Sequence, residues 1–193
     1  MDGPRSELSR GDLTAEGVVL LHRGRSRNPD VLLVPAARGR PPLVVKDFAP
    51  RPAWVRASLG PVIARREARA YRALAGHPAV PAFRGWIDRL AFALEYRPGR
   101  RMSRKLRGTV PADFVARLEA DLADMHARGV AHLDLRHRSN VLVGADGAPV
   151  LIDFGSAVCL RPGGRLARWL LPWLARVDRA AVRKWRERLA PGD

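Results

Sequence analysis

The feature that most constrains the fold is a series of short apolar runs in the first half of the chain, each long enough only for a β-strand. In chain order they read GVVLLHRG, VLLVPAA, LVVKDF, AFRGWI and LAFALEY. Each is rich in valine, leucine or aromatic residues and most are bounded by Gly, Pro, Asn or Asp, a pattern typical of antiparallel strands. A helical spacing at residues 61–75 separates the third run from the fourth. Residues 17–97 are therefore predicted to form an antiparallel sheet with one helix.

The second half of the chain has a different pattern. Arg97-Pro98-Gly99 interrupts the apolar runs and marks a boundary between two lobes. A helix is predicted over residues 111–129, because its apolar residues recur every three to four positions. The runs NVLVG and PVLIDFG then flank an Asp-Gly pair, which indicates a β-hairpin. The sequence thus predicts an α+β protein with an N-terminal lobe at residues 17–97 and a C-terminal lobe at residues 98–193.

Both ends of the chain carry separate expectations. Residues 1–16 are polar and charged, and we expect a flexible lead-in without a secretory signal. From Gly164 onward the pattern predicts two helical pieces, separated near Pro172 or Val177. The segment 165–193 combines tryptophan and leucine with many arginines. It is interpreted either as a helix that caps the C-terminal lobe or as an interfacial helix on an anionic membrane.

The charge balance indicates the partners. The chain has 35 basic and 19 acidic residues, a net charge of +16, and only three of the basic residues are lysine. Such an excess attracts polyanions, so anionic headgroups, phosphorylated sugars, nucleotides and nucleic acid are all candidate partners. The single cysteine, Cys159, suits a reducing compartment. We expect a cytoplasmic protein, either free or peripheral at the inner face of the membrane.

Polar clusters interrupt the apolar runs of the second half. The sequence His132-Leu133-Asp134-Leu135 follows the predicted helix, Asn140 directly precedes one strand, and Asp153-Phe154-Gly155 ends the next. Carboxylate and amide oxygens are the ligands that Mg²⁺ prefers, and phosphoryl transfer needs charge neutralised on nucleotide phosphates. Alone, Asp153 would equally suit a turn. The ordered set resembles the protein-kinase-like superfamily, with its H-x-D-L loop, Asn and D-F-G motif.

The resemblance implies a two-lobe kinase-like fold, ATP as phosphate donor and Mg²⁺ as cofactor. Asp153 would hold one magnesium ion and Asn140 a second. Asp134 would orient the acceptor hydroxyl and accept its proton, and Arg136 would face the transferred phosphate. His132 would brace the loop by hydrogen bonding near the D-F-G backbone.

The resemblance extends upstream to the predicted sheet. Lys46 ends the run LVVK, which is similar to the superfamily's V-A-I-K strand, whose lysine contacts the α- and β-phosphates. Glu67 lies further along the chain, inside the predicted helix, and is expected to be its ion-pair partner. The alternatives are an edge-strand charge for Lys46 and ordinary surface pairs with neighbouring arginines for Glu67.

The adenine would lie against the segment LEYRPG. Backbone groups of residues such as Glu95 and Arg97 would bind the base there, and Val44 and Leu142 would pack on its two faces. All four assignments are implied by the resemblance alone.

Several departures from the superfamily pattern narrow the choice. Asn140 lies one position further from Asp134 than the commonest pattern places it, and Ser139 occupies the usual position. We prefer Asn140 because the VLV run follows it directly. No G-x-G-x-x-G is present, so the turn HRGRSRNPD would cover the phosphates with a single glycine. No A-P-E follows, and the sequence ends at Asp193, soon after Gly155, which predicts a truncated C-terminal lobe.

In this respect the chain resembles RIO-type atypical kinases and bacterial lipopolysaccharide core (Kdo/heptose) kinases, which have minimal lobes. The acceptor hydroxyl is accordingly expected on a protein Ser/Thr or on a lipopolysaccharide core sugar. The alternative from another class is a pseudokinase, a basic module that binds nucleotide, RNA or membrane without turnover.

Overall fold

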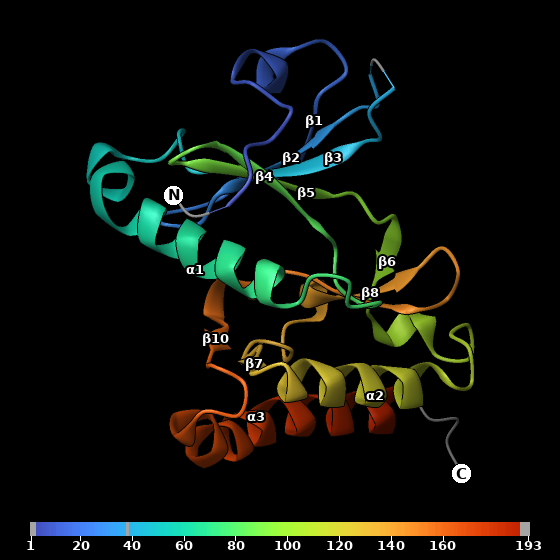
Figure 1. Ribbon diagram of the computed structural model, residues 1–193. Coiled ribbons are helices and arrows are strands. Elements are labelled where there is room, and N and C mark those ends of the chain that lie inside the picture. Colours follow the sequence, from blue (N-terminus) through green and yellow to red (C-terminus); the bar gives the residue numbers. More distant parts are fainter. Residues whose placement is uncertain (1–2, 38, 190–193) are drawn as a thin grey trace. The chain divides into compact units, whose positions relative to one another are not determined.

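The computed structural model describes residues 3–37 and 39–189, and over these residues the chain is an α+β protein (Figure 1). Its contacts divide it into two compact units, and each contains segments that are separated in the sequence. The first unit comprises residues 1–68 and 82–96, and the second comprises residues 69–81 and 97–193.

The first unit contains a five-stranded antiparallel sheet in the order β1-β2-β3-β5-β4. Its strands are β1 (Val19–His22), β2 (Asp30–Val34), β3 (Leu43–Asp47), β4 (Phe83–Asp88) and β5 (Ala91–Glu95). A π-helical turn at Val55–Leu59 follows β3 and leads into the helix α1 (Gly60–Ala73), whose residues up to Ala68 belong to this unit. The five strands and the helix confirm the pattern predicted from the apolar runs. Because side chains alternate along a strand, Leu43 and Val45 share one face of β3, and Val44 and Lys46 share the other.

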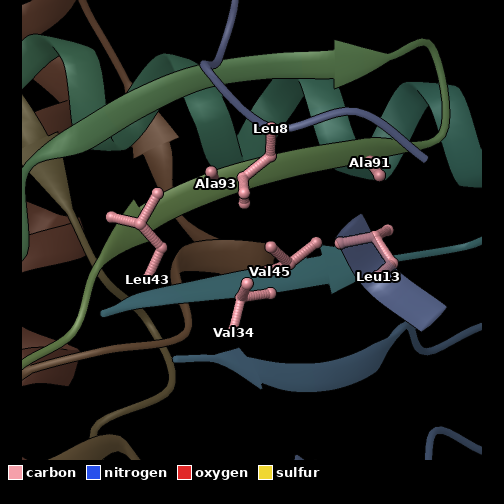
Figure 2. Packing of buried hydrophobic residues seen from close by; sticks show 7 residues of the cluster. All are labelled: Leu8, Leu13, Val34, Leu43, Val45, Ala91 and Ala93. Atoms are coloured by element: carbon pink, nitrogen blue, oxygen red, sulfur yellow. The ribbon is translucent and has the colours of Figure 1, made fainter. Parts of the chain in front are cut away.

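The apolar core of the first unit includes the lead-in of the chain. Leu8 and Leu13 are buried in a cluster with residues of β2, β3 and β5 (Figure 2); the other members are Val34, Leu43, Val45, Ala91 and Ala93. The backbone of residues 4–6 also pairs with Trp86 on β4. The expectation of a flexible lead-in over residues 1–16 is therefore wrong for residues 3–16, and residues 1–2 lie outside the described residues. Two leucines in a polar segment provide enough apolar surface to pack on the sheet.

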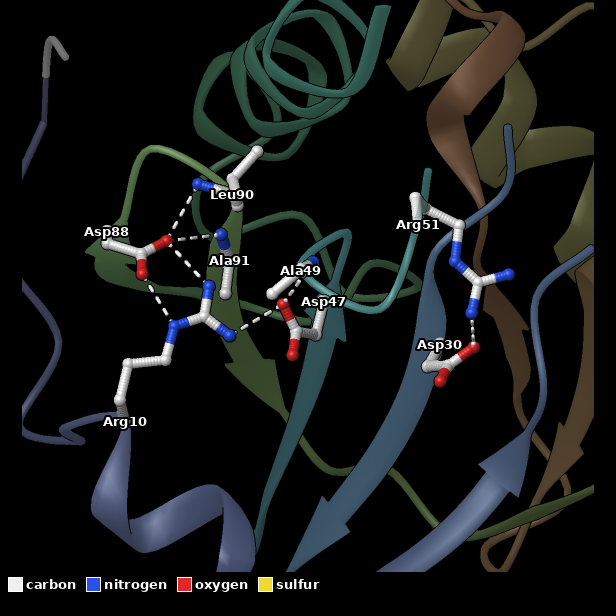
Figure 3. Close-up of polar contacts among 8 residues, drawn as sticks. All are labelled: Arg10, Asp30, Asp47, Ala49, Arg51, Asp88, Leu90 and Ala91. Carbon is white, nitrogen blue, oxygen red and sulfur yellow. Dashed lines mark hydrogen bonds and ion pairs between the residues drawn. The ribbon is translucent and has the colours of Figure 1, made fainter. Parts of the chain in front are cut away.

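An ion-pair cluster fixes the same segment (Figure 3). The Arg10 guanidinium lies 2.7 Å from a carboxylate oxygen of Asp47, and it donates to both carboxylate oxygens of Asp88 at 2.5 and 2.8 Å. Burial alone would raise the pKa of Asp88, but hydrogen bonds from Arg10 and from the N–H groups of Leu90 and Ala91 outweigh it and lower that pKa. The lead-in is thus held by charge as well as by apolar packing.

The second unit consists of two larger helices and small sheets. These elements are β6 (Gly99–Arg101), α2 (Phe114–Ala127), β7 (Val130–Ala131), β8 (Val141–Gly144), β9 (Pro149–Leu151), β10 (Val158–Cys159) and α3 (Arg165–Leu189). Strands pair in the orders β6-β8-β9 and β10-β7, and the β8–β9 pair is the hairpin predicted from the Asp-Gly signal. The helices α2 and α3 pack side by side (Figure 1).

The helix α3 corrects the expectation of two helical pieces, because it runs without a break through Pro172 and Val177. A proline inside a helix loses one backbone hydrogen bond, at a cost of about 3 kcal/mol. Burial of larger side chains further along the helix, such as Val182 and Trp185, offsets that cost. None of the helices described is both long and apolar enough to cross a membrane.

Candidate functional site

The clearest polar feature of the first unit is a buried ion pair. The Lys46 Nζ on β3 lies 2.5 Å from the Glu67 Oε1 on α1, and the two residues are 7% and 1% exposed. The predicted pairing of Lys46 with Glu67 is confirmed, and the surface-pair alternative for Glu67 is wrong. Because the desolvation cost of a buried ion pair rivals its Coulombic gain, such a pair adds little to stability. Its presence favours a chemical role for the lysine.

Two other predicted nucleotide-binding residues lie in the same unit. Val44 is half-buried on the same face of β3 as Lys46. Glu95, at the end of β5, is held by Ala82: its N–H donates to the Ala82 carbonyl at 2.9 Å, and its carboxylate accepts from the Ala82 N–H at 2.9 Å. An adenine at this segment would therefore have to use backbone groups other than the Glu95 N–H.

Arg97 and Leu142 belong to the second unit. The Arg97 guanidinium donates to the Pro78 carbonyl, which directs this side chain back onto its own unit. Leu142 lies on β8 and is half-buried. Its partial exposure leaves room for a contact with a ligand.

The HLDL loop, residues 132–140, brings Asp134 and Asn140 together. The Asn140 side-chain amide donates to the carbonyl and to the carboxylate Oδ2 of Asp134, both at 3.0 Å. Its own Oδ1 accepts from the Ser139 hydroxyl at 3.0 Å. Asn140 is buried whereas Ser139 is exposed. The longer spacing thus still brings the amide against the aspartate.

His132 is the buried brace of this loop. Its Nε2 lies 3.0 Å from the Ile152 carbonyl, directly before Asp153, and its Nδ1 accepts from the Asp134 N–H at 3.3 Å. These contacts confirm the predicted brace near the D-F-G backbone. Burial lowers the pKa of His132, so the ring is neutral and Nδ1 is available as an acceptor. The one ring therefore connects the HLDL loop to the strand that carries Asp153.

Asp153 exposes its side chain at the end of the β9 segment. Its backbone N–H donates to the Tyr71 hydroxyl at 3.1 Å, and its φ is +66°. The next residue, Phe154, is buried against Tyr71 and His132, with ring centroids 5.0 and 4.6 Å apart. Asp153 and Asn140 offer carboxylate and amide oxygens, the hard donors that suit Mg²⁺. The donor set therefore fits the implied metal.

Left-handed backbone conformations mark three segments of the chain. Among the described residues, the non-glycine residues with positive φ are Ser26 at 54°, Leu133 at 66° and Asp153 at 66°. They lie in the β1–β2 turn, in the HLDL loop and in the D-F-G motif, which are the segments that the sequence assigned to chemistry. Such conformations persist only where the surroundings hold them, and they are enriched at functional sites.

Asp178 on α3 is a supporting residue that sequence reasoning missed. It is fully buried, and its carboxylate accepts from the N–H groups of His132 at 2.9 Å and Leu133 at 2.8 Å. His126 on α2 lies 3.0 Å from the same carboxylate, which supplies the partner that the sequence had not identified for this histidine. The available signal was that Asp178 is the lone acidic residue in the arginine-rich segment before Glu187.

The β1–β2 turn, residues 23–29, is held by a charged clamp (Figure 3). Asp30 accepts from the Gly24 N–H at 2.8 Å and from the Arg51 guanidinium at 2.7 Å. Arg51 also donates to the Gly24 carbonyl. A Cβ at Gly24 would overlap the backbone of Asn28 and Pro29, so this one glycine is needed where the chain folds back on itself. The turn is therefore fixed in shape despite having no glycine-rich sequence.

Arg136 completes the set of predicted residues. It is exposed two positions after Asp134, and it lines a hollow of about 440 Å³ together with residues of α3. The hollow lies wholly within the second unit. A cation at this position remains accessible to a ligand.

No family model matches the chain, and the search of the curated proteins gives no match.

Proposed function

We propose that the chain is a magnesium-dependent phosphotransferase with a two-lobe protein-kinase-like fold, which transfers the γ-phosphate of ATP to a hydroxyl group. The observation that carries this proposal is the buried Lys46–Glu67 ion pair. A protonated lysine held by a carboxylate in a desolvated place is suited to neutralise the α- and β-phosphates of a nucleotide.

The HLDL loop supports the acceptor side of the reaction. The Asp134 carboxylate would accept the proton of the acceptor hydroxyl while that oxygen forms its bond to the γ-phosphorus and the bond to ADP breaks. Asn140 holds this carboxylate through Oδ2, and Nε2 of His137 lies 3.5 Å from Oδ1. Arg136 would offset the negative charge of the transferred phosphate.

Asp153 and Asn140 would hold magnesium through their oxygen atoms. Bound there, the metal neutralises charge on the nucleotide phosphates. The left-handed backbone of Asp153 and the hydrogen bonds of Asn140 orient these side chains before a ligand arrives.

The acceptor follows from the resemblance and from the charge of the chain. A protein Ser/Thr and a lipopolysaccharide core sugar both offer the required hydroxyl, and the net charge of +16 favours an acceptor that carries negative charge. Nucleotide binding without turnover would instead indicate a pseudokinase.

Replacement of Lys46 tests the proposal. We expect the purified chain with Mg²⁺ to form ADP from ATP, by hydrolysis or autophosphorylation, and Lys46→Met to lower kcat/KM by roughly 100-fold or more. Lys105→Met is the matched control, because Lys105 is an exposed lysine of the second unit, and it should leave the rate unchanged. Equal rates for Lys46→Met and wild type would refute the proposal, and ATP binding with no ADP formed by wild type would establish the pseudokinase instead.

A further inference from the structure

The N-terminal half of α3 exposes large apolar side chains opposite its buried face. Trp169 and Trp173 are 71% and 61% exposed, whereas Trp185, further along the same helix, is 1% exposed. Leu166 and Val177 are exposed as well, and spacings of three and four residues place all four exposed side chains along one stripe. An exposed apolar stripe of this kind indicates an interaction surface for another macromolecule or for a membrane.

The charges around this stripe select a partner. The six basic residues that α3 carries between positions 165 and 184 are Arg165, Arg168, Arg176, Arg179, Arg183 and Lys184, and all of them are exposed. The only acidic residue in that range, Asp178, is buried. The Arg176 guanidinium lies 4.3 Å from the centre of the Trp173 ring, so cation and aromatic group share one patch. The patch therefore complements a negatively charged partner.

The hollow beside the HLDL loop continues this patch. Its charged residues are Arg136 from the loop and Arg176, Arg183 and Lys184 from α3, all of them basic, and its apolar lining includes Val177 of the stripe. Four cations around a space of about 440 Å³ suit a phosphate group. Because Arg136 is two residues from Asp134, the loop that carries the proposed base also contributes to this hollow.

We propose that α3 binds the surface of an anionic lipid bilayer, with Trp169 and Trp173 at headgroup depth and a lipid phosphate in the hollow beside Arg136. Tryptophan and basic residues on one side of a helix are the composition of interfacial helices. The buried face of α3 caps the core of the second unit, and its exposed face would lie on the membrane, so the lobe-capping and the interfacial interpretation apply to the same helix. Residues 190–193 of the segment 165–193 lie outside the described residues. If the proposed function also holds, the acceptor hydroxyl belongs to a membrane-bound, anionic molecule.

Vesicle sedimentation with the full chain tests the stripe. Wild type should sediment with phosphatidylcholine vesicles that contain phosphatidylglycerol and stay in solution with phosphatidylcholine alone. The double variant Trp169→Ala/Trp173→Ala should bind the anionic vesicles at least about tenfold more weakly. Trp54→Ala removes an exposed tryptophan of the first unit and should bind like wild type. Equal binding by the double variant and wild type would overturn the inference.

A second variant tests the cationic hollow without altering apolar surface. Arg176→Gln/Arg183→Gln/Lys184→Gln should weaken binding roughly 100-fold, because each basic residue near an anionic surface contributes about a factor of five. The matched control removes the same charge from three exposed arginines of α1 in the variant Arg65→Gln/Arg66→Gln/Arg69→Gln, and binding should fall far less. Equal losses in the two triple variants would show that only net charge matters and would overturn the assigned site.

The readout is independent of catalysis. Asp134→Asn should sediment with anionic vesicles as wild type does, so a failure of the proposed function leaves this measurement intact. No sedimentation of wild type would overturn the membrane inference even if ATP were turned over. A dimer that the tryptophan variant converts to monomer, or RNA binding that the α3 charge variant abolishes while vesicles remain unbound, would also overturn it.

Discussion

The β1–β2 turn and the HLDL loop both hold a non-glycine residue in the left-handed backbone region, and in both a buried aspartate accepts from backbone N–H groups. In the turn the aspartate is Asp30, which starts β2 and pairs with the Arg51 guanidinium. In the loop it is Asp178, which accepts two backbone N–H bonds and contacts His126. The first anchor is a charged clamp between the start of β2 and the segment that follows β3, whereas the second reaches the loop from α3, a helix that is distant from the loop in the sequence.

The two loops differ in the origin of their support. The turn is held by Asp30 at the start of β2 and by Arg51, which follows β3. The HLDL loop depends on α3, because the acceptor for its N–H groups comes from that helix. The same helix thus packs the second unit, shapes the loop with Asp134, and presents the exposed apolar stripe with the basic residues around it.

Removal of the α3 anchor should have the larger effect. Asp178→Ala leaves two buried N–H groups without their acceptor, and we expect the free energy of unfolding to fall by about 3–5 kcal/mol. Urea unfolding followed by circular dichroism measures this change. Glu187→Ala removes an exposed acid from the same helix and should stay within about 0.5 kcal/mol of wild type. A loss for Asp178→Ala as small as that of the control would show that α3 does not support the loop.

Removal of the clamp in the turn should have a smaller, local effect. Arg51→Met leaves Asp30 without its cation, and we expect a loss of about 2 kcal/mol in the free energy of unfolding. If the turn covers the nucleotide phosphates, KM for ATP should also rise several-fold, because the turn then samples other shapes. Arg56→Met, at an exposed arginine nearby, serves as the control. A loss larger than that of Asp178→Ala would reverse the comparison.

The pH dependence of stability gives a further test of the loop, because His132 is buried in it. Burial keeps the pKa of His132 below the value of about 6.5 for an ordinary histidine. Below pH ~6.5 this histidine therefore binds more protons in the unfolded chain than in the folded chain. The free energy of unfolding consequently decreases as the pH is lowered, by at most about 1.4 kcal/mol per pH unit. Protonation would also remove the Nδ1 acceptor from the Asp134 N–H.

The measurement compares urea unfolding across this acidic range. His132→Gln should show a shallower decline in the free energy of unfolding than wild type, whereas His22→Gln, at an exposed histidine of β1, should follow wild type. An identical pH dependence for His132→Gln and wild type would show that this ring does not titrate on unfolding.

Local patterns were enough to predict several features of the fold and of the candidate site. Lys46 and Glu67 lie on a strand and a helix that are each recognisable by their periodicity, whereas their pairing was implied by the resemblance to the protein-kinase-like superfamily. Asn140 directly precedes an apolar run, and in the structure it hydrogen-bonds to Asp134. The strand and helix patterns themselves lie within a few residues of each side chain.

Features that depend on distant partners could not be predicted. Asp178 reaches the loop only after α3 has packed, and the role of Arg51 depends on a turn that precedes it by two strands of the sheet. Two leucines among charged residues do not predict a strand or a helix, so the sequence predicts a loose lead-in, yet Leu8 and Leu13 are buried in the core. Pro172 suggested a break that burial of larger side chains further along the helix overrides.

The most direct test of the account replaces the proposed base while keeping the fold. ADP formation from Mg²⁺-ATP should be at least about 100-fold slower in Asp134→Asn than in wild type, because a positioned base contributes roughly that factor or more. Binding of a non-hydrolysable ATP analogue should stay within a few-fold, and Asp113→Asn, at an exposed aspartate of the same unit, should turn over like wild type. Equal ADP formation by Asp134→Asn and wild type would contradict the claim that this chain transfers phosphate through Asp134.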